Sequence, residues 1–286
     1  MNENIIEITI DDAIFPDHLK QIKNPPRILY CIGNIELLTY QGVAVVGTRR
    51  CSPYGRWAAY EIGKQIADCG VTVISGMAEG VDSEGHRGCL DAEGNTIAVM
   101  GTGIDICFPR SNKKLYERIA NKGLVISEYG PGDNTGPWAF PERNRIISGL
   151  AKSVVVVEGT KKSGSLITAN LALEQSREVF AVPGNINQPN AAGVNLLIRD
   201  GAIPITSIEE VPEILQIGES KTFKRKLEKC SNDEKKILKY IKENPGSNIE
   251  TIAFKMNMEM SETSAITIAL ELKGYIKKIY DDLYVL

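Results

Sequence analysis

The stretch that decides the fold is residues 43–82, VAVVGTRRCSPYGRWAAYEIGKQIADCGVTVISGMAEGVD. Residues 43–46 form a short run that is apolar on both faces, which is typical of a parallel strand covered by helices. Ser52 then predicts a helix N-cap with Pro53 at the first helical position, and apolar residues at helical spacing follow. Residues 71–74 predict the next buried strand. The stretch therefore reads as one strand–helix–strand unit with a glycine turn after each strand.

Both glycine turns fall at the carboxyl edge of the same sheet, because the two strands are parallel. Open α/β sheets bind ligands at this edge, where helix N-termini offer backbone N–H groups to phosphate. The first turn also carries Arg49 and Arg50, and the second begins with Ser75 and Gly76. Glycines alone would only permit tight turns, but two adjacent arginines favour an anion-binding site.

The glycine turns do not match the nucleotide-binding motifs. G-x-G-x-x-G is absent, since the next glycine after Gly47 is Gly55, and G-x-x-x-x-G-K-[ST] does not occur. At the end of the second strand, where an acidic residue would bind a ribose, Ser75 and Gly76 stand instead. We therefore expect no nicotinamide, flavin or other cofactor.

Composition indicates a soluble globular protein of about two domains. The 286 residues are 43% hydrophobic and 24% charged, with a net charge of −3. No run of 18 apolar residues occurs, and the acidic N-terminus lacks a signal-peptide pattern, so we expect a cytoplasmic protein without a membrane anchor. The net charge argues against non-specific coating of duplex DNA but allows a local basic groove. Six cysteines without a C-x-x-C pair, and only two histidines, predict no metal site.

The chain divides by composition into four parts. Residues 1–42 predict an N-terminal extension with a short helical piece at 11–23, and residues 43–217 predict the sheet domain. Residues 218–230 are polar and basic with little periodicity, which indicates a linker. Residues 231–286 predict three helices and a terminal hairpin, the plan of a winged helix. The expected fold class is α/β with a parallel sheet, followed by a small C-terminal winged-helix-like domain.

Several later segments extend the sheet and its edge. Residues 96–100 and 153–157 predict further strands, each closed by a glycine-containing turn. Between them, residues 128–141 predict a loop rich in Gly and Pro. Residues 143–150 predict a helix whose first turn is charged and whose later residues are buried.

Together with residues 43–82, these segments resemble the DprA/Smf family of DNA processing proteins. The matching pieces, which cover most of residues 28–215, are VVGTRRCSPYG, VISGMAEGVDSEGHRGCL, PERNRIISGLA, VVVVEGTKKSGSLITANLALEQSREVFAVPG and GVNLLIRDGA. The resemblance implies an extended Rossmann-like parallel sheet with helices on both faces. It also implies a protein that binds single-stranded DNA, forms a homodimer and loads the recombinase RecA during natural transformation or related recombination. We expect such a protein to be no enzyme and to have no catalytic residue.

The resemblance implies that residues of the matching motifs contact DNA. These residues are Arg49, Arg50, Ser75, Gly76, Arg143, Arg145, Lys162, Ser163, Gly164 and Ser165. The arginines come first on physical grounds, because single-strand binders combine a cationic track with planes on which bases stack. Phe140 is a candidate for stacking, with a place in the core as its alternative. All these segments are expected to converge along the carboxyl edge of one sheet.

The C-terminal module lacks the excess of positive charge that is typical of a domain that binds duplex DNA. Residues 230–286 contain eight Lys or Arg against nine Asp or Glu, and the helix that would enter a major groove carries Glu262 and Glu271. We expect a protein-contact or regulatory role for it.

The alternative function is a Rossmann-like nucleotide hydrolase acting on nucleoside monophosphates. Its motif would be P-G-G-x-G-T-x-x-E, but residues 158–165 have lysines where that motif has a glutamate. Glu79 and Asp82 would be the acid and base of such an activity. The preference of helix N-termini for acidic residues also explains them.

Overall fold

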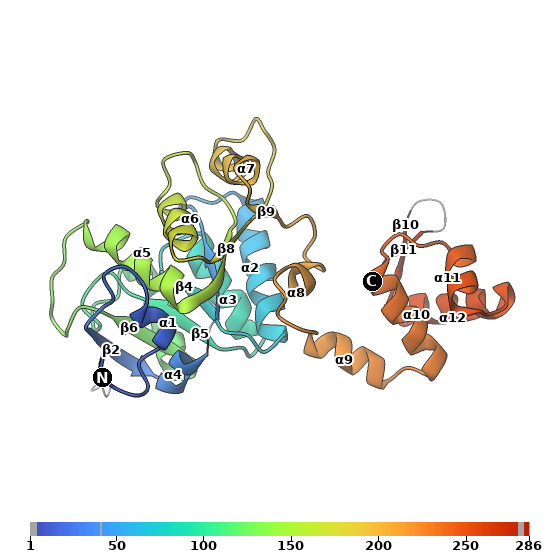
Figure 1. Cartoon of the computed structure of the whole chain (residues 1–286), viewed down its shortest axis with the longest axis horizontal. Coiled ribbons are helices and arrows are strands. Elements are labelled where there is room, and N and C mark those ends of the chain that lie inside the picture. Colours follow the sequence, from blue (N-terminus) through green and yellow to red (C-terminus); the bar gives the residue numbers. More distant parts are fainter. Residues whose placement is uncertain (1–4, 41, 280–282, 286) are drawn as a thin grey trace. The chain divides into compact units, whose positions relative to one another are not determined.

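The computed structural model describes residues 5–40, 42–279 and 283–285. The chain divides into two compact units, unit 1 (Met1–Gly218) and unit 2 (Glu219–Leu286), which Figure 1 colours along the sequence. Over the described residues, no helix has both the length and the apolar character needed to cross a membrane.

Unit 1 is built on one sheet with the order β1-β2-β6-β5-β4-β3-β7-β8-β9 over its described residues. Its strands are β1 (Ile6–Thr9), β2 (Ile28–Gly33), β3 (Gly42–Val46), β4 (Val73–Ser75), β5 (Thr96–Val99), β6 (Leu124–Ser127), β7 (Ala151–Val156), β8 (Glu178–Ala181) and β9 (Ile203–Pro204). Neighbours from β6 to β9 are parallel, whereas β1 and β2 are antiparallel additions next to β6. The chain order reverses between β3 and β7, which is the switch point of a Rossmann-like sheet.

Helices cover both faces of the sheet (Figure 1). One face packs against α2 (Pro53–Asp68), α3 (Val81–Asp91), α4 (Lys113–Lys122) and α8 (Val211–Ile214). The other packs against α1 (Asp17–Lys20), α5 (Ala139–Leu150), α6 (Gly164–Glu174) and α7 (Ala192–Arg199). Short 3₁₀ turns are η1 (Ile35–Thr39), η2 (Arg110–Asn112) and η3 (Pro189–Ala191). The extended Rossmann-like sheet with helices on both faces is therefore confirmed.

The central strands are apolar on both faces because each face has its own helix layer. In β3, Val43 and Val45 belong to the cluster around α2, while Ala44 and Val46 belong to the cluster with α5 and α6. This is the burial that the uninterrupted apolar run in residues 43–46 predicts. The expected cap of α2 is also confirmed, since the Ser52 hydroxyl accepts a hydrogen bond from Gly55 N–H.

Unit 2 consists of α9 (Lys221–Glu228), α10 (Asn232–Glu243), α11 (Ile249–Met256), α12 (Met260–Leu272), β10 (Lys277–Ile279) and β11 (Leu283–Val285). The two strands pair antiparallel, so helices α10 to α12 and the strand pair follow the winged-helix plan. Residues 280–282 of the predicted hairpin lie outside the described residues. A capping box between Ser231 and Glu234 starts α10.

Two local predictions are wrong in their secondary structure, and the range predicted as a linker contains a helix. The helical piece at 11–23 is reduced to the four residues of α1. The range 218–230 contains the helix α9, whose start is capped by the Ser220 hydroxyl. The loop predicted for 128–141 ends earlier, because α5 begins at Ala139 and admits Pro141 in its first turn, where no N–H donor is needed.

Candidate nucleic-acid interface

A cleft of about 670 Å³ opens at the carboxyl edge of the sheet, over the switch point between β3 and β7. The turn after β3, helix α5 and the turn that leads into α6 line it. It contains these residues of the predicted site: Arg49, Arg50, Arg143, Ser163, Gly164 and Ser165. Gly76 lines a smaller cavity of about 110 Å³ that shares Arg49, Phe140 and Arg143 with the cleft. Segments far apart in the sequence therefore converge at this edge.

Arg49 and Arg50 are the exposed cations of this cleft. Within the described residues, neither guanidinium has a carboxylate at ion-pair distance. The Arg49 guanidinium carbon lies 5.5 Å from the centroid of the Phe140 ring, a cation–π arrangement. The Arg50 backbone is held by the Asn190 side chain, whose Nδ2 donates to Arg50 O at 2.8 Å. The turn is thus fixed by its backbone while its charges remain available.

The turns after β3 and β4 touch each other at Gly80. Gly80 has φ of +80°, and a Cβ there would lie 2.4 Å from the carbonyl oxygen of Thr48, so only glycine fits. Val81 N–H donates to the same Thr48 oxygen at 3.3 Å. The position of the Arg49 turn therefore depends on the start of α3.

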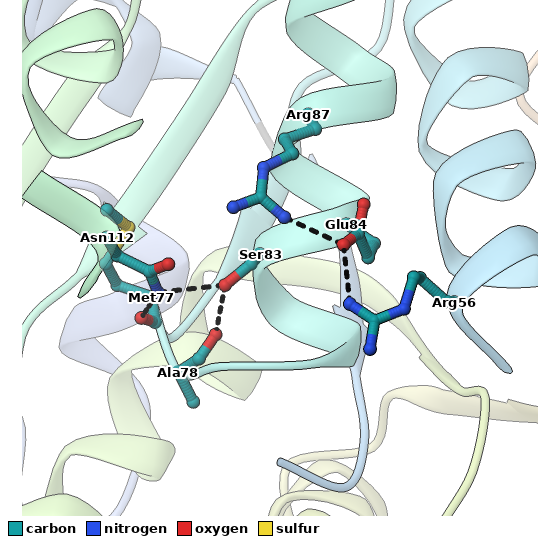
Figure 2. Close-up of polar contacts among 7 residues, drawn as sticks. All are labelled: Arg56, Met77, Ala78, Ser83, Glu84, Arg87 and Asn112. Atoms are coloured by element: carbon teal, nitrogen blue, oxygen red, sulfur yellow. Dashed lines mark hydrogen bonds and ion pairs between the residues drawn. The ribbon is translucent and has the colours of Figure 1, made fainter. Parts of the chain in front are cut away.

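The start of α3 is tied to the loop before it, as Figure 2 shows. Asn112 Nδ2 donates to Met77 O and to Ser83 Oγ, each at 2.9 Å. Ser83 Oγ in turn donates to Ala78 O at 2.5 Å. All these groups are buried or half-buried, so the hydrogen bonds hold the segment after β4 in one conformation.

Two further arginines near this edge already have a partner. Glu84 accepts from Arg56 at 3.2 Å and from Arg87 at 2.7 Å (Figure 2). The Glu84 carboxylate offsets one of these two guanidinium charges, whereas the ion pairs of the described residues include neither Arg49 nor Arg50.

Arg143 is buried beneath the cleft, with 5% of its surface exposed. Its Nη1 donates to Gly76 O at 2.7 Å and to Val99 O, and so joins the turns after β4 and β5. Its counter-charge is Asp82, whose Oδ2 accepts from Gly76 N–H at 3.1 Å and Ala78 N–H at 3.4 Å. Arg143 and Asp82 therefore fix the backbone of the glycine turns.

Burial is the largest influence on the pKa values of Asp82, Arg143 and the neighbouring His86. It raises the pKa of Asp82 to about 6, against the opposing effects of the Arg143 charge and of backbone N–H groups. Burial lowers the pKa of Arg143 to about 10, which leaves it charged at neutral pH. The pKa of His86, buried beside them, falls to about 3 for the same reason, so its ring is neutral.

The other predicted site residues lie in different surroundings. Ser75 is fully buried and donates to Val45 O at 2.6 Å, so its side chain holds two strands together. Arg145 forms an ion pair with Glu128, in which its Nη2 atom donates to both carboxylate oxygens, at 2.7 and 2.8 Å. Lys162 is exposed on the turn before α6 but does not line the cleft. As DNA contacts, all three remain predictions.

The N-terminus of α6 offers hydrogen-bond donors to the cleft. Ser163 is its N-cap residue and uses its hydroxyl to accept from Thr160 N–H at 2.8 Å. The Ser165 Oγ atom is buried, lines the cleft and has no hydrogen-bond partner among the described residues. A helix start with unused donors favours a negatively charged ligand.

Sequence reasoning missed Phe108 and Asn190. Phe108 lies in the loop after β5, with its ring centroid 5.2 Å from that of Phe140, and it lines both cavities. The sequence signal for Phe108 is an aromatic residue in the loop that follows a glycine turn. Asn190 reaches Arg50 across 140 residues of sequence, and no local pattern signals such a contact.

Glu79 and Asp82, the carboxylates of the alternative function, have different hydrogen-bond partners. Glu79 accepts from the Ser111 hydroxyl at 2.6 Å, while Asp82 is bound to backbone N–H groups under the cleft. Across the described ranges, no group of three or more His, Cys, Asp or Glu side chains is placed to hold a metal ion.

The fold and cleft together define a Rossmann-like α/β protein whose cleft at the switch point is lined by the exposed residues Arg49 and Arg50. Within that class, the chain belongs to the DNA recombination-mediator protein A family, whose model matches residues 7–216. The match ends two residues before unit 1 ends, so unit 2 lies outside it.

Known proteins similar to this chain agree with that assignment. It is 42% identical over 203 residues to DNA processing protein DprA of Streptococcus pneumoniae, with 71% of this chain and 72% of the relative covered. The crystal structure of that pneumococcal protein superposes with a TM-score of 0.70 at 40% identity, over 73% and 74% of the two chains. DNA processing protein A of Helicobacter pylori, solved for insight into its single-stranded DNA binding mode, gives 0.68 at 30% identity, over 77% and 100%.

Proposed function

We propose that this protein binds single-stranded DNA in the cleft over β3 and β7 and acts as a recombination mediator that delivers the strand to RecA. The observation that carries the proposal is the pair of exposed, unpaired guanidinium groups of Arg49 and Arg50 beside the free donors of α6. The single-stranded DNA named for the Helicobacter pylori relative supports the same ligand. Homodimer formation and a role in natural transformation belong to the same proposal.

The shape of the cleft favours a single strand over a duplex. Its cations are local, so a stiff duplex could bring only a few phosphates to them, whereas a flexible strand can place successive phosphates in the turns. Phe140 and Phe108 present aromatic rings beside Arg49, where bases can stack. Little sequence selectivity is expected, because every base has a stacking face.

Each predicted contact takes one of two roles in this proposal. Arg49 and Arg50 in the cleft, with Lys162 on the exposed turn before α6, neutralise phosphates, and the backbone of Gly164 and Ser165 donates to them. The remaining ones, Ser75, Gly76, Arg143, Ser163 and Arg145, position the turns that carry these groups. Residues 43–217 would carry the DNA function, with 1–42 as an extension of the sheet, 218–230 as a linker and 231–286 as a separate module.

The test is binding of a fluorescent oligothymidine by the double variant Arg49→Ala/Arg50→Ala. Each charge-assisted phosphate contact is expected to be worth about tenfold in affinity, so the double variant should bind far more weakly than the parent. Arg199→Ala is the matched control, because Arg199 is an exposed arginine that does not line the cleft and is paired with Asp200. Equal binding by the parent and the double variant would contradict the proposal.

A further inference from the structure

A second cavity, of about 660 Å³, opens beside the cleft at the carboxyl ends of β7 and β8. Val157, Val182 and Val194 give it an apolar floor. Its rim is polar and carries the ring of Tyr54 from the first turn of α2 and the amide of Gln188 from the loop before α7. The DNA contacts proposed above leave this cavity unused.

The charges around this cavity exclude a phosphate as its ligand. Glu158 is the only charged side chain among the described residues that line it. Its carboxylate accepts from Ser52 N–H at 2.8 Å and from the Ser52 hydroxyl at 2.5 Å, and no cation stands opposite it in the cavity. A phosphate there would face a carboxylate without compensation. The suitable ligand is neutral, flat and able to form hydrogen bonds at its edge.

Asn190 connects the second cavity to the cleft, since it lines both. Its Nδ2 donates to Arg50 O at 2.8 Å, and Glu158 Oε2 lies 3.5 Å from the same atom. A chain of phosphates that reaches Arg50 therefore has the mouth of the second cavity next to it, where no cation attracts a further phosphate. In a DNA strand, the group attached beside each phosphate is a sugar with a neutral base.

The ring of Tyr54 is preorganised at the rim. Its hydroxyl donates to Pro183 O at 3.4 Å, and its centroid lies 6.0 Å from that of Trp57. Tyr54 as a whole residue is 47% exposed and lines the cavity, so a ligand in the cavity can reach it. A ring held in this way loses little freedom when a base stacks on it.

We propose that the second cavity binds one nucleobase of the DNA strand whose phosphates lie in the cleft. Tyr54 provides the stacking surface, and the amide of Gln188 forms hydrogen bonds to the edge of the base. An amide both donates and accepts, so it can pair with any of the bases. This inference rests on the proposed function, because it requires the strand to be bound in the cleft.

The experiment compares the affinity of the full chain for oligothymidine with its affinity for an abasic strand of the same length. The parent should prefer the strand with bases. Tyr54→Ala should reduce that preference about tenfold, which is the size of one base–aromatic stack. Tyr54→Phe keeps the ring and should retain the preference. Gln188→Ala, at an exposed loop position, should reduce it by a smaller factor.

Tyr40→Ala is the matched control, because Tyr40 is an exposed tyrosine that lines neither cavity. If the parent prefers oligothymidine and the Tyr54→Ala and Gln188→Ala variants keep that preference, the cavity binds no base, and the cleft remains the DNA site. An equal loss of affinity for both strands would also overturn the inference, since it would place the backbone there. A parent that binds no oligothymidine would refute the proposed function itself.

Discussion

The protein has two pairs of neighbouring arginines at the same sheet edge, and they differ in almost every physical respect. Arg49 and Arg50 are exposed on a turn, and the ion pairs of the described residues do not include them. Arg143 is buried and bound to carbonyl oxygens, while Arg145 is paired with Glu128. The first pair can neutralise a ligand, whereas each guanidinium of the second pair is already held by oxygen atoms of the protein.

The difference shows that residue type and position at a sheet edge do not determine a role. What decides is whether a guanidinium still has unused donors facing solvent. A buried cation with two carbonyl partners holds two turns at a fixed separation, and its removal leaves a buried counter-charge. The two pairs should therefore respond in opposite ways to substitution.

The largest expected effect is that of Arg143→Ala on stability. Asp82 would remain buried without its counter-charge, and the free energy of unfolding of unit 1 should fall by about 3–5 kcal/mol. Chemical denaturation followed by tryptophan fluorescence measures this, because both tryptophans, Trp57 and Trp138, lie in unit 1. Lys161→Ala, an exposed neighbour of the cleft, serves as the control. A loss below 1 kcal/mol would mean that Arg143 does not position the turns.

A second, smaller effect concerns pH. The pKa of Asp82 is raised by burial to about 6, so the carboxyl gains a proton as the pH falls through that value. A raised carboxyl pKa stabilises the fold at low pH, and this contribution is lost as the pH rises from about 4 to 6. Protonation also leaves the Arg143 charge uncompensated beneath the cleft. Affinity for oligothymidine should therefore increase about fivefold between pH 7.5 and 5.5, about 1 kcal/mol for one added charge.

The pH effect has an internal control. Asp82→Asn removes the titrating group and should flatten the dependence, with ionic strength held constant. His86 lies in the same buried region but stays neutral throughout this range, because its pKa is lowered to about 3. An unchanged pH dependence in the Asp82→Asn variant would assign the titration to another group.

The smallest effect on binding is expected for Arg145→Ala. The side chains of Arg145 and Glu128 are 12% and 24% exposed, so the loss of their ion pair should cost about 1–2 kcal/mol of stability. The dissociation constant for oligothymidine should change by less than about twofold, since one salt-bridge partner rather than a phosphate contact is removed. Glu128→Gln should match it in both respects. A loss of affinity as large as that of Arg49→Ala would show that the pair opens when DNA binds.

Much of this fold could be predicted from local sequence. The apolar run of residues 43–46, the Ser52 cap and the glycine turns are short-range signals, and they place the parallel strands and the shared edge correctly. The pairing of β2 with β6 was not predicted. The two strands lie almost 100 residues apart in the sequence, and the local pattern of β2 does not indicate which strand it joins.

The site was less accessible to sequence reasoning. A charged residue near a helix start is expected to face solvent, but α5 begins at Ala139, and this turns Arg143 towards the sheet. Pairing of Arg145 with Glu128 depends on the fold of the intervening loop. The role of Asn190 between two cavities likewise requires the full three-dimensional arrangement.

The most direct test of the cleft is the salt dependence of oligothymidine affinity for the parent and for Arg49→Ala. Each phosphate neutralised on a single strand contributes about 0.7 to the slope of log affinity against log salt concentration. If Arg49 contacts one phosphate, its replacement should flatten the slope by about 0.7 while the denaturation midpoint stays that of the parent. A folded Arg49→Ala variant with the parent's affinity and slope would show that the strand does not bind in this cleft.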